Sequence, residues 1–350
     1  MSIQTAERVG PVFHGVEETD DRRFYLIGDH RLISTTAATG VIAKDALLRY
    51  AANQAVEAVF AELPAIVIAS RMKACGNTRN RCEHDRNERC DRCPCVECKA
   101  CVANWLADRH KAHSARRADE GTRTHDVAEW WSYTGEIKPY DQDIAPYVKA
   151  FEAFVAEYGL TPDSVLLSEA LVVNRGAGYA GTTDGVVRFD AAATEAAAKL
   201  VSRVTGVSWK KAAKLGLTVD LIIDYKTREG EKPKFYPEQA LQLTGYRHAP
   251  ILRIKNSDIE RPMLPTDGGL IVQLRPDGVS ARLAVTTERT YRRGFLYALG
   301  LTKWLIEEGP AAVSSHTFVL PETIAARARK AAKDAAAAPA SATEPAPAAA

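Results

Sequence analysis

Two short stretches of the chain place two carboxylates and a lysine on what read as neighbouring β-strands. Asp184 lies within residues 181–185, and Asp224 and Lys226 lie within residues 223–227. Side chains alternate along a strand, so Asp224 and Lys226 point to the same face. Carboxylates can hold Mg²⁺ or Mn²⁺ against a phosphodiester, and a nearby lysine can position the attacking water or neutralise charge that develops on phosphorus. These three side chains are the minimum set of groups for metal-dependent cleavage of a nucleic acid. Either stretch alone is more often a solvated strand face or a turn.

Two further polar features fit the same chemistry. A helix is predicted to begin at Pro237, and Gln239, Gln242 and Tyr246 share one of its faces. Their amides and phenol can orient the lysine, a water or a phosphate without competing for the metal; the alternative is an ordinary polar helix face. His125 lies in another helical pattern, and an imidazole suits manganese, although a single histidine is more often packed or at the surface.

Taken in order, His125, Asp184, Asp224-x-Lys226 and Gln242-Leu243-x-x-Tyr246 resemble the motifs of RecB-like exonucleases in the PD-(D/E)XK nuclease superfamily. The resemblance is greatest to phage relatives of the CRISPR-associated RecB-like exonuclease. It covers most of the chain, because residues 32–60 also look like the start of such phage proteins. It implies an α/β fold with a restriction-endonuclease-like core, in which helices flank a central mixed sheet.

The resemblance also implies a role for each residue. The metal ligands would be three side chains and one backbone carbonyl, those of His125, Asp184, Asp224 and Tyr225. Lys226 would be the catalytic lysine, and Gln242 with Tyr246 would form a supporting motif. Glu169, on a predicted strand over residues 165–173, would correspond to an auxiliary acidic residue.

All seven cysteines lie in one short segment: Cys75, Cys82, Cys90, Cys93, Cys95, Cys98 and Cys101. The spacings Cys90-x-x-Cys93 and Cys98-x-x-Cys101 are typical of tetrahedral zinc sites, and His84 is an eighth candidate ligand. Several RecB-like relatives hold an iron–sulfur cluster with cysteines on both sides of the core, which this clustering disfavours. The odd count argues against a disulfide framework. We expect structural zinc, with one or two ions; iron–sulfur ligation and free thiols are the alternatives.

The composition sets limits on partners. The chain has 350 residues, 46% of them hydrophobic, and lacks any apolar run close to the roughly 20 residues of a membrane span. The net charge of +2 carries little information, but residues 71–123 hold 13 Lys and Arg against 8 Asp and Glu. This excess indicates either a phosphate-binding surface that includes Arg116 and Arg117 or a solvated helix. We expect no membrane partner and a cytoplasmic location in a bacterium or phage-infected host cell.

Hydrophobic patterning predicts the elements that position these residues. They are strands within residues 22–36, helices over 43–63, 102–117 and around His125, a helix from 144 to Gly159, strands over 165–173, 185–190 and 218–227, a hairpin over 270–285, and a last helix over 288–308. The expected division is the N-terminal part of a nuclease domain (1–70), a zinc-binding insertion (71–118), the nuclease core (119–323) and an Ala/Pro-rich disordered tail (324–350), whose residues 324–333 can extend a helix.

The sequence therefore predicts an Mg²⁺- or Mn²⁺-dependent deoxyribonuclease. An exonuclease acting at the ends of single- or double-stranded DNA in replication, recombination or repair fits the resemblance, with a recombination or replication protein as a further expected partner. The alternative is a non-catalytic DNA-binding or recombination accessory protein that retains the fold.

Overall fold

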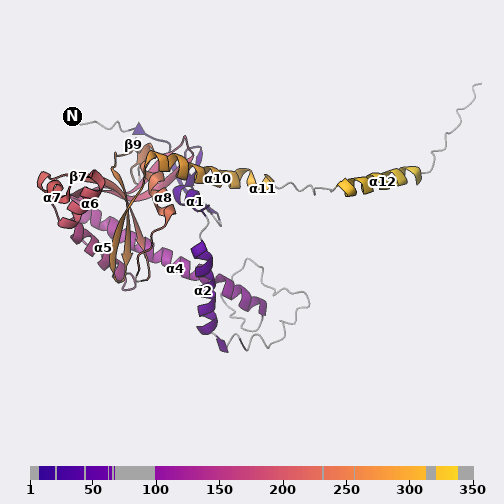
Figure 1. The fold of residues 1–350 in the computed structure, drawn as a ribbon, viewed down its shortest axis with the longest axis horizontal. Helices are drawn as coiled ribbons and strands as arrows, with labels where there is room; N and C mark the ends of the chain where they lie inside the picture. The colour runs from indigo at the N-terminus through magenta and orange to yellow at the C-terminus, as the bar shows by residue number, and fades with distance from the viewer. Residues whose placement is uncertain are drawn as a thin grey trace, which may run out of the picture. The chain divides into compact units, whose positions relative to one another are not determined.

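The computed structural model describes residues 8–19, 22–42, 45–61, 63–64, 67, 99–230, 232–255, 257–312 and 321–337. The chain divides into two compact units, Met1–Thr302 and Lys303–Ala350. The first unit contains a large mixed β-sheet with helices against both faces (Figure 1). The predicted α/β class with a central mixed sheet is thus confirmed.

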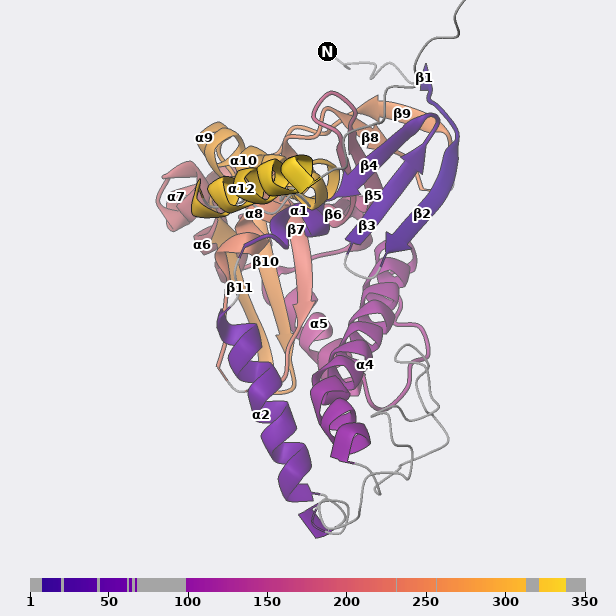
Figure 2. The ribbon, with the colours of Figure 1, turned by 90° about the vertical axis from the view of Figure 1, so that its right-hand side faces the viewer.

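The described residues form one sheet of eleven strands (Figure 2). These are β1 (Arg8–Val9), β2 (Phe13–Thr19), β3 (Arg22–Ile27), β4 (His30–Ser34), β5 (Val165–Asn174), β6 (Tyr179–Asp190), β7 (Thr218–Thr227), β8 (Ile251–Arg253), β9 (Ile259–Pro262), β10 (Gly268–Arg275) and β11 (Gly278–Ala284). The order is β1-β9-β8-β5-β6-β4-β3-β2, and a second branch runs β6-β7-β10-β11. The β4–β6 and β7–β10 pairs are parallel, and the other pairs are antiparallel.

Strand β6 is the branch point of the sheet. One of its edges pairs with β5 along most of its length. On its other edge, Tyr179 and Ala180 pair with β4, whereas Gly185 through Asp190 pair with β7. In the described structure, residues 181–184 therefore lie where β4 and β7 separate. Asp184 is at the end of this gap, next to the first residue that pairs with β7.

The helices are α1 (Thr35–Thr39), α2 (Asp45–Ala61), α4 (Lys99–Thr134), α5 (Ala145–Tyr158), α6 (Glu195–Thr205), α7 (Trp209–Leu215), α8 (Pro237–Arg247), α9 (Glu288–Thr290) and α10 (Leu296–Glu307), with a π-helical segment at Tyr291–Phe295. Helices α4 and α5 bury Trp131, Phe151 and Phe154 against one face of the sheet. Helix α8 lies against the opposite face. Gly269 of β10 is so close to α8 that a Cβ added there would lie 3.2 Å from the Leu243 side chain. The central strands are thus buried on both faces.

Two predicted boundaries differ from the structure. The expected helices over 102–117 and around His125 form one continuous helix, α4, which crosses the predicted boundary between residues 118 and 119. A glycine inside a helix costs only about 1 kcal/mol, and burial of Val127 and Trp131 on the next turns offsets this at Gly121. Strand β6 begins at Tyr179, six residues before the predicted start at 185.

Gly181 explains the second difference. A glycine-containing segment reads as a turn, but here Gly181 lies inside β6 because of close packing. A Cβ at this position would approach Thr35 Oγ1 and Tyr246 Cε1 to 2.6 Å. The glycine allows α1 and α8 to pack against the gap in the sheet.

The second unit contains α11 (Gly309–Ala312) and α12 (Pro321–Ala337). The helix that the sequence left open for residues 324–333 is present and continues to Ala337, within the segment expected to be disordered. The reason is its richness in Ala, Arg and Lys, which have the highest helix propensities. Residues 338–350 lie outside the described residues. Every helix in the described part of the chain is too short or too polar to cross a lipid bilayer.

Candidate metal centre

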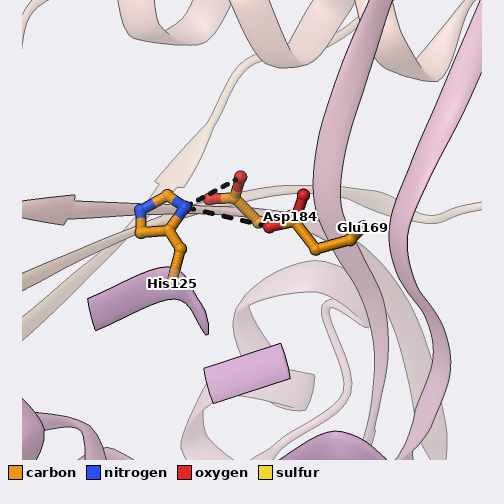
Figure 3. Close-up of side chains that lie close together, drawn as sticks. All are labelled: His125, Glu169 and Asp184. Carbon is orange, nitrogen blue, oxygen red and sulfur yellow. Dashed lines mark ion pairs between the residues drawn. The ribbon is translucent and has the colours of Figure 1, made fainter. Parts of the chain in front are cut away.

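Three side chains from three elements converge beside the gap in the sheet. His125 comes from α4, Glu169 from β5 and Asp184 from β6, and they point toward one another (Figure 3). One nitrogen or oxygen atom of each lies within 4.8 Å of the others. His125 Nδ1 is 3.5 Å from Asp184 Oδ1 and 3.9 Å from Glu169 Oε1. One imidazole and two carboxylates form a donor set that suits a divalent ion such as Mn²⁺.

The backbone of Tyr225 contacts two of these three side chains, His125 and Asp184. The Tyr225 carbonyl oxygen is 3.1 Å from His125 Nε2. The Tyr225 N–H donates to Asp184 Oδ2 at 2.6 Å, and this hydrogen bond links β7 to β6 at the end of the gap in the sheet. The carbonyl thus contacts the imidazole at Nε2, on the side opposite to the two carboxylates at Nδ1, where it orients the ring. The sequence resemblance assigned His125, Asp184 and this carbonyl to one metal, but the structure places the carbonyl at the other ring nitrogen.

Asp224 and Lys226 form a separate pair on β7. Lys226 Nζ donates to Asp224 Oδ1 at 2.6 Å. The Asp224 side chain is 1% exposed and the Lys226 side chain is 31% exposed, so part of the lysine side chain reaches solvent while the carboxylate does not. Among the described residues, Asp224 Oδ2 is buried without a hydrogen-bond partner. Asp224 is not part of the three-residue convergence, and its second oxygen is an unused acceptor.

Glu169 has an unusual backbone. Its φ angle is +45°, in the left-handed region that residues other than glycine rarely adopt. Its neighbours Ser168 and Ala170 pair with Gly185 and Thr183 of β6, so the strand continues on both sides of the irregularity. Such a conformation costs about 1–3 kcal/mol and is concentrated at functional sites. Glu169 is a member of the convergence, a role that the sequence supported only through the resemblance.

A small cavity adjoins these ligands. It is lined by His125, Glu169, Asp184 and Tyr225 at one end and by apolar side chains that include Trp131 and Ile223. Its volume of about 10 Å³ is close to that of one water-sized sphere. The cavity therefore has room for a single ion or water at a polar end with an apolar wall.

The charges at this site are strongly interdependent. Burial disfavours the imidazolium, but the adjacent Asp184 carboxylate outweighs it and raises the pKa of His125 to about 9. Burial and repulsion from Asp184 raise the pKa of Glu169 to about 7. Burial also acts to raise the pKa of Asp184, but His125 and Lys226 hold it below its usual value. Without a metal, protons thus provide the positive charge that these carboxylates require.

The Asp224–Lys226 pair behaves similarly. Burial raises the pKa of Asp224 to about 6, even though Lys226 favours its ionised form. Burial disfavours the ammonium of Lys226, but Asp224 and Asp184 outweigh it and raise the pKa of the lysine. Lys226 is therefore cationic at neutral pH and can act on a phosphate only as a charge or hydrogen-bond donor.

The affinity for Mn²⁺ should increase with pH. A metal requires neutral His125 and ionised Glu169, so binding must displace a proton from His125 below about pH 9 and a second from Glu169 below about pH 7. We expect the apparent affinity to rise up to about tenfold per pH unit between pH 7 and 9 and to level off above that range. Calorimetric titration at several pH values measures this slope. His248→Ala, which changes a histidine paired with Glu288 elsewhere, should retain the slope; a constant affinity from pH 7 to 9 contradicts the assignment.

The predicted supporting motif lies on the other side of the gap. Gln242 Nε2 donates to Tyr246 Oη at 2.8 Å, and both side chains are buried. Burial, with repulsion from Asp224, raises the pKa of Tyr246, which places its ring within the field of that carboxylate. Gln239 has a different role: its Oε1 accepts from the Tyr236 N–H at 3.0 Å and caps α8.

Two arginines of the basic segment, Arg116 and Arg117, form contacts within the protein. Arg117 is 15% exposed and donates to Glu120, to Tyr147 Oη at 2.5 Å and to Glu229 at 3.4 Å. Arg116 forms ion pairs with Glu120 and Glu229. These arginines join α4 to α5 and to the segment after β7.

The cysteine segment lies mostly outside the described residues. This applies to six of the seven cysteines and to His84, whereas Cys101 lies in α4. The predicted zinc site therefore stays a prediction.

Neither a family model nor a curated protein matches this chain. Function is accordingly inferred from the residues of the site and their geometry.

Proposed function

We propose that this chain is an Mg²⁺- or Mn²⁺-dependent deoxyribonuclease with a RecB-like PD-(D/E)XK core. The observation that carries the proposal is the position of Asp184 at the gap in the sheet, beside His125 and the Tyr225 carbonyl and next to the strand that bears Asp224 and Lys226. Ligands often bind where neighbouring strands of an α/β sheet diverge. The gap between β4 and β7, beside β6, provides such a position.

The donor set fits a divalent cation. His125, Glu169 and Asp184 would hold the ion, the Tyr225 carbonyl would orient the imidazole from Nε2, and the unpaired Oδ2 would make Asp224 a further ligand. These oxygens with one imidazole suit Mn²⁺ or Mg²⁺ better than a soft metal, because no thiolate of the described residues joins them. When bound, the ion supplies positive charge for a phosphodiester and lowers the pKa of a water.

The other residues of the site have distinct roles. Lys226 is the group best placed to contact a phosphate. Its side chain is partly exposed, and its ion pair with the buried Asp224 holds the ammonium in position. The cation can position the attacking water or stabilise charge on the phosphoryl oxygens. Gln242 and Tyr246 are positioning residues: they pack behind Gly181 and keep the Asp224 side of the gap closed to bulk water.

The proposed substrate is DNA, with ends attacked on single or double strands, and the proposed setting is replication, recombination or repair in a bacterial or phage-infected cell. Digestion of end-labelled single- and double-stranded DNA with Mg²⁺, Mn²⁺ or a chelator tests this. We expect metal-dependent loss of label, with short products from one end. A chain that binds DNA tightly and cleaves none under any metal would instead be an accessory DNA-binding protein.

We also propose that the cysteine segment binds structural zinc. Residues 79–91 contain too few apolar side chains to form a core, so metal ligation would supply the local folding energy. Zinc should co-purify at one or two ions per chain, and Cys90→Ser or Cys93→Ser should release it while the Asp184 site still binds Mn²⁺. Elemental analysis checks this; iron with labile sulfide, or a reduced protein without metal, would overturn it.

A further inference from the structure

A second pocket lies at the free edge of the sheet, away from the metal centre. It has a volume of about 310 Å³, at the lower end of the range for small-ligand sites. Its walls are the C-terminal end of α5, the segment 232–236 that precedes α8, and strand β11. Among the described residues, β11 pairs only with β10, so its other edge is unpaired (Figure 2). Val279 through Arg282 of β11 line the pocket.

The pocket has the chemistry of a stacking site. The guanidinium carbon of Arg282 lies 4.6 Å from the centre of the Phe235 ring, so a planar cation covers a half-buried aromatic ring. Tyr158 contributes a second aromatic ring to the lining. Bases of single-stranded nucleic acids stack on aromatic rings and on arginine planes, largely independently of sequence.

Phe235 is held on a fixed segment. The Lys234 N–H donates to Gln273 Oε1 at 3.1 Å, and Gln273 Nε2 donates to the Lys234 carbonyl. Gln273 is itself 1% exposed on β10, so this pair of hydrogen bonds is protected from water. A binding group that is already ordered loses little freedom when a ligand arrives.

The pocket lies in line with the catalytic lysine. Lys226 of β7 is in register with Gln273 of β10, and Gln273 is in register with Ser280 of β11, which lines the pocket. Two strand spacings of about 4.8 Å place the pocket wall about 10 Å from Lys226. A single strand of a few nucleotides can span this separation.

The charges favour a base inside the pocket and phosphates outside it. Arg282 lines the pocket and is exposed, and Lys232 and Lys234 are exposed on either side of the lining residue Pro233, where a phosphate backbone can contact them. Glu157 is the carboxylate of the lining; it would repel a phosphate but can accept a hydrogen bond from the amino group of a base.

We propose that this pocket binds one base of a single-stranded DNA segment, a few nucleotides from the bond that is cleaved beside Lys226. The inference rests on the proposed nuclease function for its substrate class. Phe235 and Arg282 are the stacking residues, Tyr158 lines the opposite wall, and the Gln273–Lys234 hydrogen bonds position the ring. The segment before α8 thereby sets the register of the strand relative to the metal centre.

Binding without cleavage tests the pocket directly. Single-stranded oligonucleotides with one labelled end and a single abasic site, moved one position at a time, are titrated in EDTA and followed by fluorescence anisotropy. Wild-type protein should bind the oligonucleotide with one particular abasic position about 5- to 150-fold more weakly than the intact strand. Phe235→Ala should weaken binding of the intact strand by a similar factor and remove this dependence on position, whereas Phe235→Tyr should retain both.

Tyr297→Ala is the matched control, because it removes an aromatic side chain that is 71% exposed on α10 and does not line the pocket. Equal affinities for wild type and a folded Phe235→Ala protein, or a position dependence that survives in that variant, overturn the inference. Cleavage with Mn²⁺ separates the two proposals. A wild-type protein that shows the base dependence but never cleaves refutes the nuclease function alone, whereas cleavage and binding unaffected by Phe235→Ala refute the pocket alone.

Discussion

Asp184→Asn and Asp224→Asn should each lower the rate of DNA cleavage by several orders of magnitude. Asn keeps the shape of the side chain but removes the negative charge that would attract a divalent ion. For Asp184 the change also affects the contact with the Tyr225 N–H and the interaction with His125. Single-turnover rates at saturating Mn²⁺, together with Mn²⁺ titrations, measure the two effects separately.

Asp220→Asn is the matched control for this experiment. Asp220 lies on β7 four residues before Asp224, but its carboxylate pairs with Arg188 at the surface, at 2.8 Å. We expect its cleavage rate to stay within about twofold of wild type, because surface ion pairs contribute little. Cleavage by purified Asp224→Asn at the wild-type rate would refute its assignment as a ligand.

Lys226→Ala should lower the cleavage rate by at least about 10²- to 10³-fold, the effect typical of removing one group that stabilises transition-state charge. Its affinity for Mn²⁺ should be equal to or higher than that of wild type, because a cation next to the carboxylates is lost. This combination separates the lysine from the metal ligands, whose substitution should weaken both. Lys199→Ala, at an exposed ion pair with Glu195 on α6, is the control and should change neither.

The same substitution should destabilise the metal-free protein. Lys226→Ala leaves the carboxylate of Asp224 buried without its partner, which typically costs several kcal/mol. The loss should shrink when Mn²⁺ is added or when the pH falls low enough to protonate Asp224. Thermal unfolding with and without Mn²⁺ measures it; an unchanged melting temperature in EDTA would show that the ion pair contributes nothing to the fold.

The sequence contained enough information to locate β7, the strand that bears Asp224 and Lys226. The bounds predicted for β7 agree with the structure because apolar and polar residues follow the period of a strand from Thr218 to Thr227. The pairing of Asp224 with Lys226 follows from the same period of two. Local pattern was sufficient here, since the contact joins residues that are close in sequence.

The remaining features depend on packing between distant segments, which local pattern does not encode. Gly181 reads as a turn residue, but its role is set by Thr35 and Tyr246 from other parts of the chain. The left-handed backbone of Glu169 has no signal in the sequence, since glutamate does not favour that conformation. The gap between β4 and β7 likewise depends on which strands pair with β6. At the end of this gap, Asp184 accepts a hydrogen bond from the Tyr225 N–H.

The most direct test of the proposed metal centre is the anomalous diffraction of a crystal grown with Mn²⁺. The strongest anomalous peak outside the cysteine segment should lie within bonding distance of His125, Glu169 and Asp184, and it should be absent from a crystal of the Asp184→Asn protein. A protein that cleaves DNA with Mn²⁺, yet whose crystals show no ion at these three residues, would contradict the assignment of this site as the catalytic centre.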